Sequence, residues 1–423
     1  MKCEQIGPSM DEIVADSLLV AARDTSPVRG LTHNHYRYPA RFSPRFVRAV
    51  IELFTEPGDL VLDPYMGGGT TLVEALALRR NAIGIDVSSL AAFVSEVKTT
   101  LLSDRDVTAL RAWVKHLPAK IHMHRRSVGL ALCEQQGYQK HLASKETWRL
   151  RKAIEQALLS ALNLRPMHLE PFARCIILRT AQWALDSRRE TPTIQEFRHR
   201  IVESANSMLE GALELRRSAI ADTAHHEPSS IICLNRSVIG MENEKVIASL
   251  PSPKLVLTSP PYPGIHVLYH RWQVDGRKET PAPFWIANKL DGAGAKFYTM
   301  GDRKEPELRS YYENLRAAFC SIRRLCNQST TIVQVIAFAR PDWQLARYLD
   351  VMEENGFDEV LLPGIDDSAD GRLWRDVPNR RWHADQMGQT PGSREVVLIH
   401  RPATAKRLHP RFPTNSLDPR PTH

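Results

Sequence analysis

The spacing of apolar residues in the first hundred positions predicts alternating helices and strands. Pro44–Phe54 carries apolar residues at helical spacing behind a proline, which predicts an amphipathic helix. Leu60–Asp63 is a short apolar strand that enters a glycine loop, Thr70–Arg80 has helical spacing, and Ala82–Asp86 is a second apolar strand. This order predicts a βαβ unit, and therefore a parallel sheet with a right-handed crossover.

Between about 104 and 220 the pattern becomes helical throughout. Glycine is sparse, and apolar residues recur at helical spacing in Trp148–Leu162, Pro171–Leu185 and Ile194–Leu213. Residues 101–230 hold 20 Lys and Arg against 14 Asp and Glu, which accounts for most of the chain's net charge of +8. We therefore expect a basic, all-α insertion.

Strands and helices alternate again after this insertion. The expected elements are strands Ser230–Leu234 and Lys254–Leu257, helix Glu307–Leu325, strand Thr330–Ala337, helix Trp343–Asn355, and strands Asp358–Leu362 and Glu395–His400. The predicted fold class is α/β, one doubly wound sheet interrupted by an all-α insertion. We expect an extended N-terminal lead-in over 1–30, the two halves of the sheet domain over 31–100 and 229–402, the insertion over 101–228, and a disordered tail over 403–423.

Composition narrows the class of protein without fixing it. The pI of about 9.2 modestly favours a polyanionic partner. No run approaches the roughly 18 apolar residues of a membrane span, and acidic residues interrupt the first 28 positions before a signal sequence could develop. The six cysteines form no CxxC pair, so we expect idle thiols and a cytoplasmic location.

The glycine loop Asp63-Pro64-Tyr65-Met66-Gly67-Gly68-Gly69-Thr70-Thr71 lies where a strand passes into a helix. Glycines allow close approach of a ligand, and a helix N-terminus attracts a carboxylate or a phosphate. The loop lacks the Lys-Ser/Thr ending of a P-loop, and a dinucleotide fingerprint would need glycine where Leu72 stands. Asp86 ends the next strand, where an acid can accept hydrogen bonds from ribose hydroxyls. The alternative is a tight turn without a ligand.

Thr258-Ser259-Pro260-Pro261-Tyr262 follows an apolar strand at its carboxyl end, where open α/β sheets bind ligands. The two prolines remove N–H donors, so the loop offers carbonyl groups and the Ser259 hydroxyl as acceptors. An aryl amine donates two N–H bonds and would be complementary to such a wall, while Tyr262 could stack on an extruded base. The alternative is a proline turn of structural value only.

Together, the segments 63–71 and 258–262 closely resemble the cofactor and catalytic motifs of the amino-methylating DNA methyltransferases, the N4-cytosine and N6-adenine family. Tyr65 stands where the usual motif has Phe, and the stretch from His35 to Pro44 resembles the segment that precedes the cofactor loop in this family. The resemblance covers roughly 35–95 and 230–400. It implies a Rossmann-like methyltransferase sheet, S-adenosylmethionine as cofactor, and methyl transfer to an amino group.

The resemblance also assigns residues to roles. The catalytic tetrad would be Ser259, Pro260, Pro261 and Tyr262. The residues expected around the cofactor are Pro44, Asp63, Tyr65, Gly67, Gly69, Thr70, Thr71, Asp86, Asn235 and Thr258. Many members of the family carry Gly-Asp-Ala on the strand before the catalytic one, whereas Leu234-Asn235-Arg236 stands there in this chain.

The nature of the methylated base is less clearly marked. No Pro-Cys pair is present, which argues against C5-cytosine chemistry. Serine at the first tetrad position resembles the cytosine-N4 enzymes, and N6-adenine methylation remains the nearest alternative. An RNA base amino-methyltransferase and a non-catalytic DNA-recognition subunit are further alternatives. Methyl transfer from a sulfonium needs no Lewis acid, so no metal is expected.

The expected partner is double-stranded DNA with a flipped-out target base, in restriction-modification or phage defence, where a cognate restriction nuclease would be a second partner. The helical insertion is one candidate for the DNA-reading region. Two loops that mix basic and aromatic residues compete with it, because arginine contacts phosphates or guanine and tryptophan can wedge into an emptied base position. Their candidate DNA contacts are Arg271, Trp272, Arg277 and Lys278 in one loop, and Arg380, Arg381 and Trp382 in the other.

Overall fold

An eight-stranded, mostly parallel sheet has the strand order β3–β2–β1–β4–β7–β10–β8, with β9 also paired to β10. The computed structural model describes residues 10–404 apart from 39–40, 125–139, 189, 222–227, 265–270, 277, 291, 293–294, 303, 363–369 and 377–393. The strands of the sheet are β1 (Leu60–Asp63), β2 (Asn81–Asp86), β3 (Ile231–Asn235), β4 (Leu255–Thr258), β7 (Thr331–Ile336), β8 (Phe357–Glu359), β9 (Leu373–Asp376) and β10 (Arg394–Pro402). β10 runs antiparallel to β7, β8 and β9, whereas β4 and β7 are parallel, and the predicted α/β, doubly wound fold class is confirmed.

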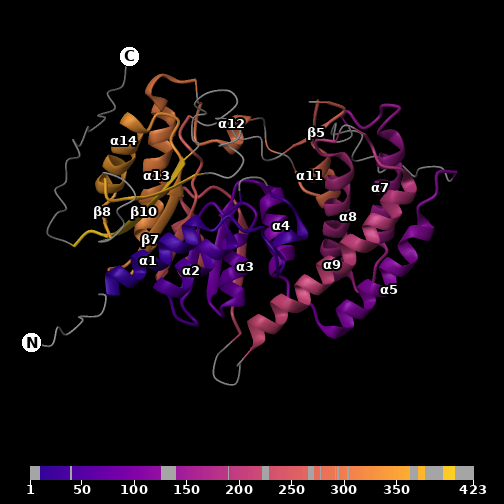
Figure 1. Cartoon of the computed structure of the whole chain (residues 1–423), viewed down its shortest axis with the longest axis horizontal. Coiled ribbons are helices and arrows are strands. Elements are labelled where there is room, and N and C mark those ends of the chain that lie inside the picture. The colour runs from indigo at the N-terminus through magenta and orange to yellow at the C-terminus, as the bar shows by residue number, and fades with distance from the viewer. Residues whose placement is uncertain are drawn as a thin grey trace, which may run out of the picture.

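Helices cover both faces of this sheet because successive strand residues point in opposite directions. On one face Leu62 and Val256 pack against α13 (Arg309–Leu325), and α14 (Pro341–Glu354) belongs to the same apolar cluster. On the other face Val61 and Leu255 pack in a cluster with α1 (Met10–Arg23), α2 (Pro44–Phe54) and α3 (Thr70–Ala77). The arrangement is a doubly wound sheet, visible in Figure 1 with α1, α2 and α3 in front of the strands.

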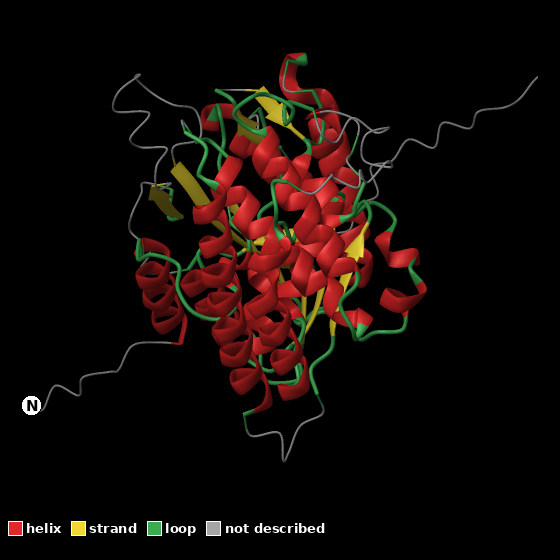
Figure 2. Cartoon of the chain, turned by 90° about the vertical axis from the view of Figure 1, so that its right-hand side faces the viewer, coloured by secondary structure: helices red, strands yellow, loops and turns green. Residues whose placement is uncertain are grey.

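The expected insertion is helical in the part of it that the structure describes. Its helices are α5 (Asp104–Lys120), α7 (Trp148–Leu162), α8 (Glu170–Leu185) and α9 (Ile194–Ile220). They share one apolar cluster with α4 (Ser89–Thr99), and Figure 2 shows them in front of the sheet when the molecule is viewed from that side. The all-α character was predictable because the 3.6-residue period is sustained over each helix.

Two segments depart from expectation. The lead-in, expected to be extended, contains helix α1, because Ala15, Leu18 and Ala22 form an apolar stripe that packs in the cluster with Val50. The segment that follows residues 258–262, the predicted catalytic loop, was expected to contact DNA. It instead joins the helical layer, which is formed by α4, α5, α7, α8 and α9. It forms a hairpin of β5 (Trp272–Val274) and β6 (Lys278–Thr280), which is followed by α11 (Ala282–Ala287). Residues of β5 and α11 belong to the same apolar cluster as α8.

The order of the strands determines where a ligand can bind. From β1 the chain continues outward to β2 and β3 on one side, while β4 and β7 lie on the other side. A crevice forms at the carboxyl ends of strands at such a reversal. The two predicted loops follow β1 and β4, so the topology brings them together. The remaining short helices are α10 (Lys245–Ala248) and α12 (Ala295–Tyr298).

Within the described residues, no helix is long and apolar enough to cross a membrane. Among the same residues, no three His, Cys, Asp or Glu side chains gather in a group that could hold a metal ion.

Candidate active site

A cavity opens at the carboxyl ends of β1, β2 and β4, between the two predicted loops. The glycine loop contributes Asp63 to Gly68 and Thr70, and the catalytic loop contributes Ser259 to Tyr262. Asp86 and its two successors line the cavity after β2, and residues 236–239 line it after β3. Segments 195 positions apart in the chain therefore share a single cavity.

Asp63 connects the two loops. Its Oδ1 accepts hydrogen bonds from the backbone N–H of Tyr65 at 3.1 Å and from the hydroxyl of Thr258 at 3.2 Å. Its Oδ2 accepts from the hydroxyl of Thr71 at 2.6 Å. Asp63 is only 2% exposed, and this burial raises its pKa to about 7, although these donors lower it. The carboxyl group thus joins the end of β1 to the start of α3 and to the end of β4.

The glycine loop rests on helix α4. Gly67 and Gly69 have φ values of +47° and +72°, which favour glycine, and a Cβ at Gly69 would lie 2.5 Å from the Ser95 hydroxyl. The buried Lys98 donates from Nζ to the Gly68 carbonyl at 2.6 Å, and burial lowers the pKa of this amine to about 7. The loop is therefore packed from behind while its backbone faces the cavity.

Asp86 lines the cavity at the end of β2, beside the glycine loop. Its Oδ2 accepts from the Gly67 N–H at 3.0 Å and its Oδ1 accepts from the Ser88 N–H at 2.8 Å. Burial raises the pKa of Asp86 to about 6, and the two backbone donors lower it. Each carboxylate oxygen has two lone pairs, so the group can still accept hydrogen bonds from a ligand.

Polar groups on both sides hold the catalytic loop. The Tyr311 hydroxyl, on α13, donates to the Pro261 carbonyl at 2.8 Å. The Ser259 hydroxyl donates to the Tyr262 hydroxyl at 3.2 Å, which in turn donates to Oε1 of Glu395 at 2.6 Å. Neither Tyr311 nor Glu395 was predicted from the sequence, because each is far from the loop in the chain and lies in no recognisable motif.

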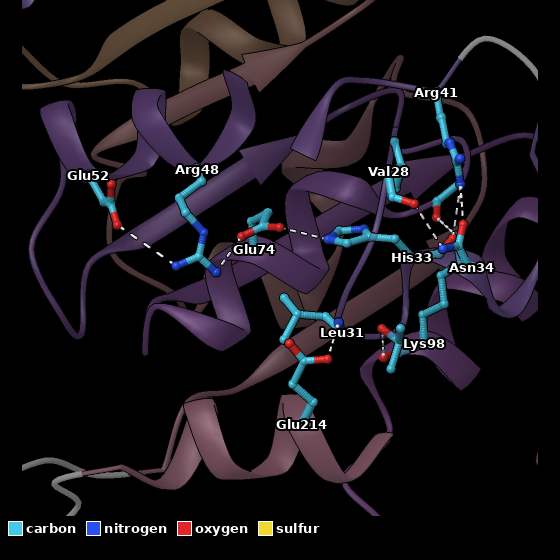
Figure 3. A network of polar contacts seen from close by, with 12 residues as sticks. Val28, Leu31, His33, Asn34, Arg41, Arg48, Glu52, Glu74, Lys98 and Glu214 are labelled. Atoms are coloured by element: carbon cyan, nitrogen blue, oxygen red, sulfur yellow. Dashed lines mark hydrogen bonds and ion pairs between the residues drawn. The ribbon is translucent and has the colours of Figure 1, made fainter. Parts of the chain in front are cut away.

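The segment before α2 brings a positive charge to the cavity. Arg41 lines the cavity, and its Nη1 donates to the His33 carbonyl at 3.2 Å. Figure 3 shows how this segment is anchored: Nε2 of His33 lies 2.7 Å from Oε1 of Glu74, and Arg48 pairs with the other oxygen of Glu74 at 2.8 Å. Glu214 of α9 also accepts from the Leu31 N–H at 2.8 Å. The segment is thus fixed to both α3 and the helical layer.

Several residues predicted to surround the cofactor do not line the cavity. Gly69, Thr71 and Thr258 lie behind the loop that does. Pro44 begins helix α2, and the cavity is lined instead by Tyr38, Arg41 and Phe42 from the same segment. Asn235 donates from its amide to the carbonyls of Asp86 and Val87, both at 3.0 Å, so it supports the turn after β2. Its neighbour Arg236 is the residue that lines the cavity.

The predicted DNA contacts are only partly among the described residues. Trp272, expected to wedge into DNA, is 2% exposed, and its indole N–H donates to the Tyr36 hydroxyl at 2.9 Å. Its position in the apolar cluster of the helical layer is a correction, since a side chain buried there cannot enter a duplex. Lys278 is exposed and pairs with Asp275 at 2.7 Å, and Arg271 is half-buried. Arg277, Arg380, Arg381 and Trp382 lie outside the described residues.

Part of the site is similar to a known protein family. Residues 21–92 match the sequence family described as DNA methylase. Over this segment the chain is therefore similar to the DNA methylase family. This matched segment contains the glycine loop and Asp86 but ends well before the catalytic loop.

Relatives among the Type II methyltransferases match over similarly short segments. The Type II methyltransferase M.MjaII of Methanocaldococcus jannaschii is 35% identical over 95 residues, covering 22% of this chain and 17% of that protein. The Type II methyltransferase M.MvaI of Kocuria varians is 38% identical over 73 residues, covering 16% of each. The aligned segments therefore span about a sixth of these relatives' own length.

A solved rRNA methyltransferase, aviRa from Streptomyces viridochromogenes, covers 91% of this chain and 92% of that one, with a TM-score of 0.31 and 12% identity. The fold class stated above comes from the strand order of the sheet and not from this structural likeness.

Similarity to this family implies S-adenosylmethionine as methyl donor, and the residues of the cavity fit it. Asp86 could accept from the ribose hydroxyls, and the Arg41 guanidinium suits the carboxylate of the methionine end. Val238 and Ile239 offer an apolar wall for adenine. Gly67 and Gly68 also line the cavity, and a Cβ at Gly68 would lie 2.8 Å from the Cβ of Tyr38, so glycine there allows Tyr38 to pack against the loop.

Proposed function

We propose that this protein is an S-adenosylmethionine-dependent DNA methyltransferase that transfers a methyl group to the exocyclic N4 of cytosine in a flipped-out base. The observation that carries the proposal is the shared cavity, in which the acidic and cationic groups for the cofactor lie beside the acceptor-rich loop Ser259–Tyr262. The family description of the matched segment, DNA methylase, supports DNA as the substrate, and the Type II names of the relatives support a restriction-modification setting. A cognate nuclease as partner and a cytoplasmic location are parts of the same proposal.

The proposed reaction follows from the chemistry of the catalytic loop. The bound cofactor supplies an electrophilic methyl group on a sulfonium. The Ser259 hydroxyl oxygen and a loop carbonyl would accept the two N–H bonds of the target amine, which localises the nitrogen lone pair and directs it at the methyl carbon. The nitrogen–carbon bond would form as the carbon–sulfur bond breaks with its electron pair left on sulfur, and the nitrogen would then release a proton to solvent.

The choice of cytosine rests on Ser259. A neutral hydroxyl at this position resembles the cytosine-N4 enzymes, whereas the adenine enzymes more often carry Asp or Asn. N6-adenine methylation of DNA is the alternative, since a hydroxyl is a weaker acceptor than a carboxylate but can still hold an adenine amine.

The decisive test is incubation of the protein with methyl-labelled S-adenosylmethionine and either plasmid DNA or total RNA, followed by digestion to nucleosides. We expect label in N4-methylcytosine from DNA. Label only in N6-methyladenine would replace cytosine by adenine, and label only in RNA, or none, would refute a DNA methyltransferase. The Ser259→Ala variant should lose activity, whereas Ser329→Ala, at an exposed serine before β7, should retain it.

A further inference from the structure

A line of four polar side chains runs from the catalytic loop to the far edge of the sheet. Ser259 donates to Tyr262, and Tyr262 donates to Oε1 of Glu395 on β10. Oε2 of the same carboxylate accepts from Arg375 on β9, with Nε at 2.9 Å and Nη2 at 2.7 Å. Glu395 and Arg375 face each other in the β9–β10 register, so the sheet itself holds the carboxylate in place.

We propose that Glu395 is a positioning residue that fixes the direction of the hydroxyl hydrogens in this line and thereby makes Ser259 an acceptor toward the substrate. The inference deepens the proposed function and rests on it. A serine hydroxyl has one hydrogen and two lone pairs, so it can face an amine as a donor or as an acceptor. Only the acceptor orientation serves an amine that presents N–H bonds.

The direction follows from the groups at the end of the line. Arg375 can only donate, and an ionised carboxylate can only accept. Glu395, 7% exposed and paired with Arg375, must therefore receive the hydrogen of the Tyr262 hydroxyl. The oxygen of Tyr262 can then accept from Ser259, and the hydrogen of Ser259 is held by Tyr262, which leaves the Ser259 lone pairs for the substrate.

The loop carbonyls make this orientation more important. The Pro261 carbonyl already accepts from Tyr311 at 2.8 Å. This bond uses one of the two lone pairs of the carbonyl oxygen, so Ser259 and the loop carbonyls must share the two N–H bonds of a substrate amine. A Ser259 hydroxyl free to rotate would present its hydrogen to the amine for part of the time.

The substitution Glu395→Gln tests the direction because it should reverse the line. Arg375 would require the amide oxygen, so the amide N–H₂ would face Tyr262. Tyr262 would then donate to Ser259, and the Ser259 hydrogen would point at the substrate. We expect kcat for DNA methylation to fall at least tenfold, with KM for S-adenosylmethionine within twofold of the unmodified protein.

Glu359→Gln is the matched control. Glu359 pairs with Arg372 through two contacts of 2.7 Å at the same edge of the sheet, and within the described part of the chain it makes no hydrogen bond to the catalytic loop. We expect its kcat to stay within twofold of the unmodified protein. An equal loss of kcat in Glu359→Gln and Glu395→Gln would overturn the proposal, because it would trace the effect to loss of a Glu–Arg pair.

Tyr262→Phe interrupts the line without altering Glu395 or Arg375, and it is the second variant should Glu395→Gln not fold. Its kcat should fall with KM for the cofactor unchanged, and adding Glu395→Gln should lower kcat by less than a further twofold. Full tenfold loss in the Tyr262→Phe background would show that Glu395 acts by another route, and an unchanged kcat in Tyr262→Phe would refute the line altogether.

A spectroscopic measurement separates this inference from the proposed function. With 3-fluorotyrosine incorporated, the ¹⁹F signal of Tyr262, assigned by its loss in Tyr262→Phe, should move in Glu395→Gln and stay in place in Glu359→Gln. If the unmodified protein methylates no nucleic acid, the proposed function fails while this signal still decides the hydrogen-bond line. A Tyr262 signal that does not respond to Glu395→Gln refutes the line whatever the activity.

Discussion

Gly69 combines a left-handed backbone with a crowded site, so its replacement has a cost that can be divided into two parts. Its φ is +72°, and a Cβ there would lie 2.5 Å from the Ser95 hydroxyl oxygen and 2.9 Å from the Ser95 Cβ. The left-handed conformation costs an alanine about 1–2 kcal/mol. Overpacking of this kind adds about 1–3 kcal/mol, so Gly69→Ala should destabilise the fold by roughly 2–5 kcal/mol.

Gly58 supplies the control for the backbone part. Its φ is +90°, and a Cβ there would meet nothing within 4 Å. Gly58→Ala should therefore cost only the backbone part, about 1–2 kcal/mol. In thermal unfolding by differential scanning fluorimetry, Gly69→Ala should lower Tm clearly more than Gly58→Ala does.

Ser95→Gly tests the steric part in a double-mutant cycle. It removes the two side-chain atoms that would collide with the methyl group introduced by Gly69→Ala. Gly69→Ala should therefore lower Tm less in the Ser95→Gly background than in the unmodified protein. Equal losses for Gly69→Ala and Gly58→Ala, or equal losses of Gly69→Ala in both backgrounds, would refute the packing of the glycine loop against α4.

Three further predictions concern the cavity and its supports. Burial raises the pKa of Asp86 to about 6, so the carboxylate gains a proton as pH falls through 6. The affinity for S-adenosylmethionine, measured by calorimetry, should therefore weaken as pH falls through this value. An equal decline in the Asp86→Asn variant would refute the assignment of Asp86 to the cofactor. Burial lowers the pKa of Lys98 from 10.5 to about 7, so between these pH values the unfolded chain binds a proton that the folded chain lacks. The free energy of unfolding should therefore rise with pH in this window, by up to about 1.4 kcal/mol per pH unit. In urea titrations the Lys98→Met variant should show a smaller rise. Tyr311→Phe removes the hydrogen bond to Pro261 and should cost about 1 kcal/mol, seen as a lower Tm with a reduced kcat; an unchanged kcat would show that the loop holds its shape without Tyr311.

The sequence was most informative where a local pattern determines the structure. Helix Pro44–Phe54 and helix Trp148–Leu162 have the predicted bounds, because the period and the flanking residues are local signals. The shared position of the two loops also followed from sequence, since both follow apolar strands of one parallel sheet.

Contacts made through space could not be predicted in this way. Glu395 and Tyr311 contact the catalytic loop from elements that are distant in the sequence. Lys98 supports the glycine loop from helix α4, and no sequence motif marks it. Trp272 was predicted to contact DNA because its loop mixes basic and aromatic residues. Its indole is buried instead, since a nonpolar ring packs in the helical layer and its N–H meets the Tyr36 hydroxyl.

The pairing of β1 with β4 has a consequence for how the chain acquires its structure. Their terminal residues Asp63 and Thr258 are 195 positions apart, and the helices of the insertion lie between them. Contacts between such distant residues form slowly because a long loop must close first, whereas helices form from local contacts. During synthesis helices α5, α7, α8 and α9 can therefore form before β4 has been made and can pair with β1. The catalytic cavity is then among the last parts of the molecule to exist, and a chain released before β10 would lack Glu395 behind Tyr262.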